Sequence, residues 1–167
     1  LSNWYETRTE PTSPAMAAAI NDAFVENDPL SPAKNTRAVV VLHKGKLIGE
    51  QYAPEINRET PLLGWSMTKS LTSTLFGMMA DRDKVKIADV TGIPSWQNDE
   101  RKNITWKHLL QMNSGLRWKE DYEDLSNAVT MLFNSDAIGR YALSVPAESE
   151  PGVVWNYSSG TSNILSS

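Results

Sequence analysis

The stretch GWSMTKSLTSTLFGMMAD, residues 64–81, carries the clearest helical pattern in the chain. Met67, Leu71 and Leu75 recur every four residues, a spacing that places them on one face of a helix. Ser66 stands where this helix should begin. The pattern predicts a central helix whose apolar face is buried.

Ser66 and Lys69 form an S-x-x-K motif at the start of this helix. Three residues are close to one helical turn, so the hydroxyl and the amine can meet. A serine hydroxyl needs a base, and a lysine can serve when its surroundings favour the uncharged amine. Unpaired N–H groups at a helix start also favour the negative charge that develops during acyl transfer. The alternative is a capping serine beside a surface lysine.

The same motif also occurs at Ser31-Pro32-Ala33-Lys34. This second match lies in a polar link, and no amphipathic helix follows it. We therefore predict a solvated turn at this position.

Tyr157 is the second residue with candidate chemistry. It lies in Tyr157-Ser158-Ser159, after the turn signal Pro151-Gly152 and an extended run. A phenolate stabilised by a nearby lysine could take the proton of Ser66 and return it to the leaving group. The alternative is a core tyrosine whose hydroxyl bonds the backbone.

The rest of the chain predicts one hairpin and several short helices. Two β-prone runs, residues 37–43 and 47–52, are joined by the tight-turn signal Lys44-Gly45-Lys46. Thr105 can cap a helix at 106–112, in which His108 is expected to be a hydrogen-bonded packing residue. Further helices are expected at 14–26, 126–134, 136–143 and from Ser159 onward.

Composition limits the classes of function. The 167 residues carry a net charge of −4, which disfavours nucleic acid as a partner, and contain no cysteine and only two histidines, which disfavours a metal site. No run approaches the roughly 20 apolar residues that span a bilayer. One domain is the expectation for this length.

Taken together, the two motifs resemble the serine β-lactamase and penicillin-binding protein superfamily. The chain looks most similar to class C β-lactamase-like esterases and amidases, including 6-aminohexanoate-dimer hydrolases. The hairpin, the Gly64–Ser70 helix start, the stretch from His108 to Leu116 and the run from Pro151 to Tyr157 follow the family's order.

The resemblance implies an α+β fold, in which a helical region packs on an antiparallel sheet and only the first strands are present. Residues 1–167 would be the N-terminal portion of one such domain. It implies an acyl-enzyme at Ser66, proton transfer by Lys69 and Tyr157, a substrate contact from Ser159, and no cofactor or metal. The family usually has asparagine in place of Ser159, and its third motif has no candidate after Tyr157.

The expected function is hydrolysis of a small-molecule ester or amide. Two alternatives stay open: a penicillin-binding sensor domain that is acylated without turnover, and a β-lactamase or D-Ala-D-Ala carboxypeptidase. The expected partner is a C-terminal segment of the same protein, on the same or a separate chain, without which the fragment should be inactive. The resemblance favours a periplasmic or secreted location over a cytoplasmic one.

Overall fold

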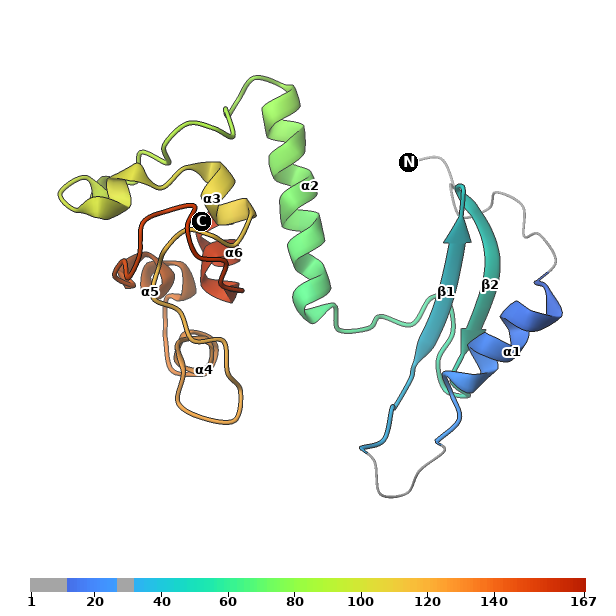
Figure 1. The fold of residues 1–167 in the computed structure, drawn as a ribbon. Coiled ribbons are helices and arrows are strands. Elements are labelled where there is room, and N and C mark those ends of the chain that lie inside the picture. Colours follow the sequence, from blue (N-terminus) through green and yellow to red (C-terminus); the bar gives the residue numbers. More distant parts are fainter. Residues whose placement is uncertain (1–11, 27–31) are drawn as a thin grey trace. The chain divides into compact units, whose positions relative to one another are not determined.

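The computed structural model describes residues 12–26 and 32–167. The chain divides into two compact units, Leu1–Leu63 and Gly64–Ser167 (Figure 1). Across the described residues, helices accompany a single two-stranded antiparallel sheet, which makes the structure α+β as expected.

The first unit begins with helix α1, Pro14–Asp22. Ser13 caps it, because its hydroxyl accepts a hydrogen bond from the N–H of Met16 at 3.2 Å. The predicted end at residue 26 was wrong. The N–H groups of residues 23–25 bond to carbonyls three residues earlier, so the chain tightens into a turn after the last helical residue.

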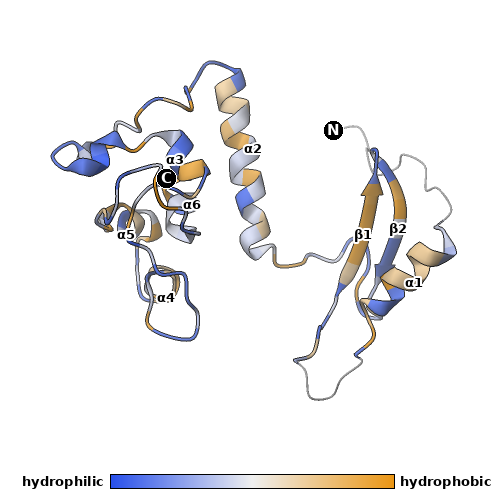
Figure 2. Ribbon diagram, viewed as in Figure 1, coloured by the Kyte–Doolittle hydropathy of each residue, from blue (hydrophilic) through white to orange (hydrophobic). Residues whose placement is uncertain are grey.

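Strands β1, Ala38–His43, and β2, Lys46–Tyr52, form the predicted hairpin. Lys44 and Gly45 both have positive φ, 50° and 75°, as the two central residues of a tight hairpin turn require. Helix α1 packs against β2, where a side chain at Gly49 would collide with Ile20. Figure 2 shows the run of hydrophobic residues along β1.

The second unit begins with a short 3₁₀ turn, Trp65–Met67, that leads into helix α2, Thr68–Asp81. The helix was predicted, but its predicted burial was wrong. Met67, Leu71 and Leu75 are 71%, 64% and 62% exposed. The side of α2 that packs carries Phe76, which contacts Trp106, and nothing within residues 64–167 covers the other side.

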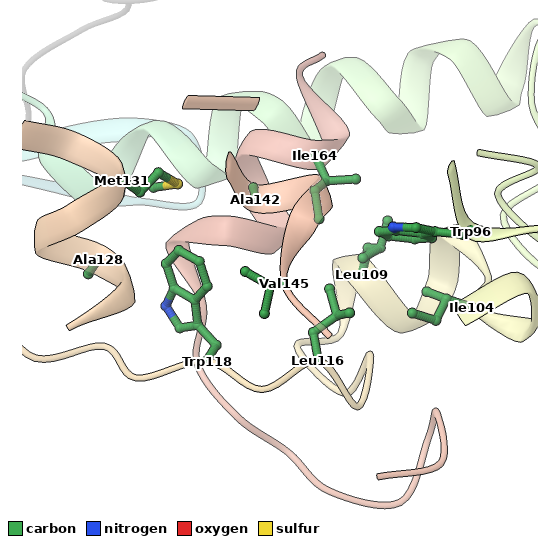
Figure 3. Close-up of a cluster of buried hydrophobic side chains, with 10 residues drawn as sticks. All are labelled: Trp96, Ile104, Leu109, Leu116, Trp118, Ala128, Met131, Ala142, Val145 and Ile164. Atoms are coloured by element: carbon green, nitrogen blue, oxygen red, sulfur yellow. The ribbon is translucent and has the colours of Figure 1, made fainter. Parts of the chain in front are cut away.

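Short helices build the remainder of the second unit around one core (Figure 3). The predicted helices are confirmed, with ends that differ by a few residues. They are α3, Trp106–Leu110; α4, Asn127–Phe133; α5, Ile138–Ser144; and α6, Ser159–Leu165. Two 3₁₀ turns, Pro94–Trp96 and Glu100–Asn103, precede them.

Helix α3 ends two residues before the predicted position. Met112 has a φ of 58°, which ends the helical conformation. At Gly115, φ is 78° and an added Cβ would lie 2.1 Å from the carbonyl oxygen of Ser149, so only glycine fits. These two residues turn the chain from α3 toward the loop that contains Trp118.

Within the described ranges, we find no helix with the length and apolar character needed to cross a bilayer.

Candidate active site

Ser66 lies in the 3₁₀ turn that precedes α2 and is exposed. Trp65, immediately before it, has a φ of 41°, a left-handed conformation that is rare for a bulky residue. Such strain persists only where the surrounding structure enforces it, and it is concentrated at functional positions. The N–H of Met67 donates to the carbonyl of Gly64 at 2.9 Å, which closes the turn around Ser66.

Lys69 lies one turn further along and joins two hydroxyl groups. Its Nζ is 3.0 Å from Ser66 Oγ and 3.1 Å from Ser159 Oγ. The hydroxyl and the amine of the S-x-x-K motif therefore meet, as their spacing predicts. The second contact links α2 to the start of α6, 90 residues later in the chain.

Tyr157 lies beside the same amine. The centre of its ring is 4.8 Å from Lys69 Nζ, a cation–π distance. In the described part of the chain, no hydrogen bond joins the Tyr157 hydroxyl to Ser66 or to another group. The structure brings Tyr157 to Lys69 through its ring, and the proton-transfer role of its hydroxyl stays a prediction.

Ser159 is fixed by the way α6 begins. Ser158 caps the helix, accepting a hydrogen bond from the N–H of Thr161 at 3.1 Å. Gly160, which follows Ser159, lies so close to Trp118 that an added Cβ would be 2.5 Å from the indole ring. The indole and the cap together hold Ser159 over Lys69.

The Ser159 hydroxyl donates to Glu120 Oε1 and accepts from Lys69. It is buried, with 7% of its surface exposed. Its predicted contact with substrate stays a prediction, since both of these hydrogen bonds are made within the protein.

Glu120 is a site residue that the sequence reasoning missed. Its carboxylate accepts four hydrogen bonds, from the N–H and the hydroxyl of Ser159, from the Tyr122 hydroxyl and from the Trp118 indole N–H. Burial alone would raise the pKa of Glu120, but these four donors together hold that pKa below its ordinary value. The sequence offered one signal for this residue: in the run 118–122, Glu120 lies between Trp118 and Tyr122, two aromatic residues that can donate hydrogen bonds to it.

Tyr122 is 55% exposed, yet it lines the same cavity as Ser66. Its hydroxyl donates to Glu120 Oε1 at 2.6 Å, which raises the pKa of Tyr122 because the phenolate would face a carboxylate.

The cavity beside Ser66 has a volume of about 190 Å³, and most of its lining residues carry a polar group. It lies entirely within the second unit. Its lining residues are Trp65, Ser66, Thr68, Lys69, Thr72, Tyr122, Leu132, Ser159, Ser162, Asn163 and Ser166. The wall offers hydroxyl and amide groups next to the nucleophile candidate, as a site for a polar carbonyl compound requires.

His108 is a packing residue, as predicted. Its Nδ1 accepts a hydrogen bond from the N–H of Thr105 at 3.2 Å, and the Thr105 hydroxyl accepts from the N–H of His108. Burial, with a smaller contribution from the charge of Lys107, lowers the pKa of His108. The reciprocal pair caps α3 and takes no part in the site.

Ser31 of the second S-x-x-K match lies outside the described residues. Lys34 from that match donates from Nζ to the carbonyl of Asp22 at 2.9 Å and is exposed. For residues 12–26 and 32–167, no group of three or more acidic or histidine side chains is arranged to hold a metal ion.

Comparisons with known proteins identify a family and a shared fold. The sequence matches the beta-lactamase family over residues 25–167. A solved Bacillus anthracis protein named as a 6-aminohexanoate-dimer hydrolase shares the fold, with a TM-score of 0.66 and 19% identity. The similarity covers 90% of this chain and 40% of that one, so the chain spans well under half of that protein's length.

No curated protein matches the sequence. The family match nevertheless extends over most of the chain and includes Ser66, Lys69, Glu120, Tyr157 and Ser159. The chain belongs to the beta-lactamase family, within the superfamily of serine β-lactamases and penicillin-binding proteins.

Proposed function

We propose that this protein is a serine hydrolase that cleaves an ester or amide bond through an acyl-enzyme at Ser66. The observation that carries the proposal is the 3.0 Å hydrogen bond between Lys69 Nζ and Ser66 Oγ. It pairs a candidate nucleophile with a candidate base at the wall of a cavity, which is the arrangement that covalent catalysis needs. The family match and the relative named as a 6-aminohexanoate-dimer hydrolase support the same reaction class.

In the proposed reaction, Ser66 Oγ attacks the carbonyl carbon of the substrate and loses its proton. Lys69 accepts that proton as the uncharged amine, and Tyr157 shares in passing it to the leaving group. The leaving alcohol or amine departs with the proton, and the acyl group stays on Ser66. Water then attacks the acyl-enzyme by the reverse proton path and releases the acid.

The negative oxygen of the tetrahedral intermediate needs hydrogen-bond donors. The backbone N–H of Ser66 is the proposed first donor, since no acceptor in the described ranges is bonded to it. A second donor is proposed to come from another segment of the protein.

An esterase or linear-amide hydrolase is preferred to a β-lactamase. Ser159 stands where related β-lactamases usually have asparagine, and its hydroxyl is already bonded to Lys69 and Glu120. A sensor domain is the second candidate, because acylation needs only Ser66 and its base, while turnover also needs a positioned water.

Pre-steady-state kinetics with a chromogenic ester and a linear amide distinguish these functions. The proposal predicts a burst followed by steady product release, and the loss of both in Ser66→Ala. A burst without turnover would favour the sensor. Turnover of a β-lactam at a higher kcat/KM than either linear substrate would favour a β-lactamase.

We further propose that a C-terminal segment, on the same chain or a separate one, completes the site. The exposed side of α2 carries Met67, Leu71 and Leu75, and the chain spans 40% of its structural relative. Additional strands could cover this side and supply the second donor. Residues 1–167 expressed alone are expected to lack esterase turnover, and a cooperatively folded, active monomer of these residues would overturn this part of the proposal.

A further inference from the structure

We propose that Glu120 is a positioning residue, which acts through Ser159 to hold the Lys69 amine against Ser66. The inference rests on the proposed function, because it concerns how the base of that reaction is held. Three hydrogen bonds connect the groups in series. Lys69 Nζ donates to Ser66 Oγ and to Ser159 Oγ, and the Ser159 hydroxyl donates to Glu120 Oε1. All four residues lie within the second unit.

The carboxylate of Glu120 is fully used as an acceptor. Oε1 accepts from the hydroxyls of Ser159 and Tyr122, and Oε2 accepts from the backbone N–H of Ser159 at 2.8 Å and from the indole N–H of Trp118. Four donors converge and no donor is required from the side chain. An ionised carboxylate accepts from all four donors as they stand, whereas a protonated acid or an amide would require one or both hydroxyls to turn and accept.

Because Ser159 is the donor in its hydrogen bond to Glu120, the group that it presents to Lys69 is determined. Ser159 has a single hydroxyl proton, and Glu120 holds it. Ser159 therefore presents only a lone pair to Lys69 Nζ, 3.1 Å away, and Lys69 must be the donor in that contact. In the structure Lys69 donates to Ser66 Oγ as well. In the proposed reaction, the uncharged amine keeps one N–H on Ser159, and its lone pair turns to the Ser66 hydroxyl and accepts the proton.

Glutamine at this position would reverse the arrangement. The two N–H donors at Oε2 cannot become acceptors, so the amide oxygen must take that side. The NH₂ group would then face the Ser159 and Tyr122 hydroxyls, which would have to accept from it. The Ser159 proton would be released and could point at Lys69, so the amine would lose its fixed orientation.

Labelling of Ser66 by a fluorophosphonate in the intact natural protein tests this inference. The rate of labelling reports how well Ser66 is activated, and the final extent reports the fraction of folded sites. Glu120→Gln should lower the rate by about 10²-fold, the loss expected when a catalytic group is misplaced, with the extent unchanged. A purely structural role would lower the extent and leave the rate per site unchanged.

Two further variants test whether Glu120 acts on Lys69 through the Ser159 hydroxyl. In a Ser159→Ala background, Glu120→Gln should change the rate by no more than about threefold, because the hydroxyl that transmits the effect is already gone. Asp121→Asn is the matched control. It removes a neighbouring charge that pairs with Lys119 rather than with the site, and it should label at the parent rate.

Three results would overturn the inference. The first is a Glu120→Gln variant that is labelled at the parent rate. The second is an equal loss of labelling rate when Glu120→Gln is made in the parent and in Ser159→Ala. The third is a loss of labelling extent with no loss of rate. If Glu120→Gln does not fold, Ser159→Ala tests the inference in its place. It removes the hydroxyl that connects Glu120 to Lys69, so it must itself lower the labelling rate. Absence of labelling at Ser66 in the parent protein would instead reject the proposed function, and this inference with it.

Discussion

The two sides of helix α2 differ in how far their side chains are packed and hydrogen-bonded. On one side, Lys69 joins Ser66 and Ser159 by hydrogen bonds, and Phe76 is buried against Trp106. On the other side, the apolar side chains of α2 are exposed, with Leu71 at 64%. The hydrogen bonds from Lys69 to Ser66 and Ser159 are formed within residues 64–167, whereas the exposed apolar side chains of α2 have no partner there, so the two properties can be tested separately.

The largest expected effect on the polar side comes from Lys69→Ala. Loss of the proposed base should lower turnover by on the order of 10²-fold or more, the range for positioned acid–base catalysis. Steady-state kinetics of the intact protein measure it. Lys84→Ala, at an exposed lysine beyond the end of α2, is the control and should keep parental turnover. Equal turnover in the two variants would remove Lys69 from the mechanism.

Tyr157→Phe tests the hydroxyl while keeping the ring beside Lys69. Turnover should fall by on the order of 10²-fold because proton transfer is impaired, and thermal stability should be nearly unchanged since that hydroxyl makes no hydrogen bond in the described residues. The matched control is Tyr141→Phe. Its hydroxyl accepts from Asn127, so this change should cost about 1 kcal/mol of stability and no activity. Ordinary activity in Tyr157→Phe would return the residue to a packing role.

Stability measurements sharpen the contrast between the packed and exposed sides of α2. Phe76→Ala should cost about 3–5 kcal/mol in denaturant unfolding, because a buried aromatic ring is lost. The packing of residues 64–167 leaves Leu71 exposed, so Leu71→Ala should cost that unit less than about 0.5 kcal/mol. In the intact protein, the proposed C-terminal segment would raise the cost of Leu71→Ala to about 2–5 kcal/mol. A small cost there as well would mean that nothing covers this side.

The smallest expected effect is on the pH dependence of stability and comes from His108, which lies in α3 rather than on either side of α2. Burial lowers the pKa of His108 in the folded state, so the unfolded chain binds a proton at higher pH than the folded one. Stability should therefore fall as pH drops through the ordinary histidine pKa of 6.5, and this contribution should be complete above it.

His108→Gln keeps an acceptor for the capping contact with Thr105 and removes the titration. Thermal unfolding between pH 5 and pH 8 should show a flatter profile for this variant. An unchanged profile would show that His108 does not contribute to the pH dependence.

Much of the fold follows from local sequence patterns. Lys44-Gly45 predicts the hairpin because few residues accept positive φ, and Thr105 predicts the start of α3 because its hydroxyl can cap it. Local patterns do not determine burial. The four-residue spacing of Met67 and Leu71 indicates that one side of α2 is apolar, but it does not indicate whether anything covers that side.

The site was predictable only in part, for a related reason. Ser66 and Lys69 are one helical turn apart, so their contact follows from helix geometry alone. Glu120 meets Ser159 across 39 residues, and that contact depends on the close packing of Gly160 against Trp118. No periodicity or motif encodes such a convergence.

The most direct test of the account is to locate the covalent adduct that a fluorophosphonate forms with the intact protein. Mass spectrometry of the digested product should place a single adduct on the peptide that contains Ser66, and Ser66→Ala should remove it. An adduct on Ser31 or another serine, or one that survives Ser66→Ala, would contradict the assignment of the nucleophile and the mechanism built on it.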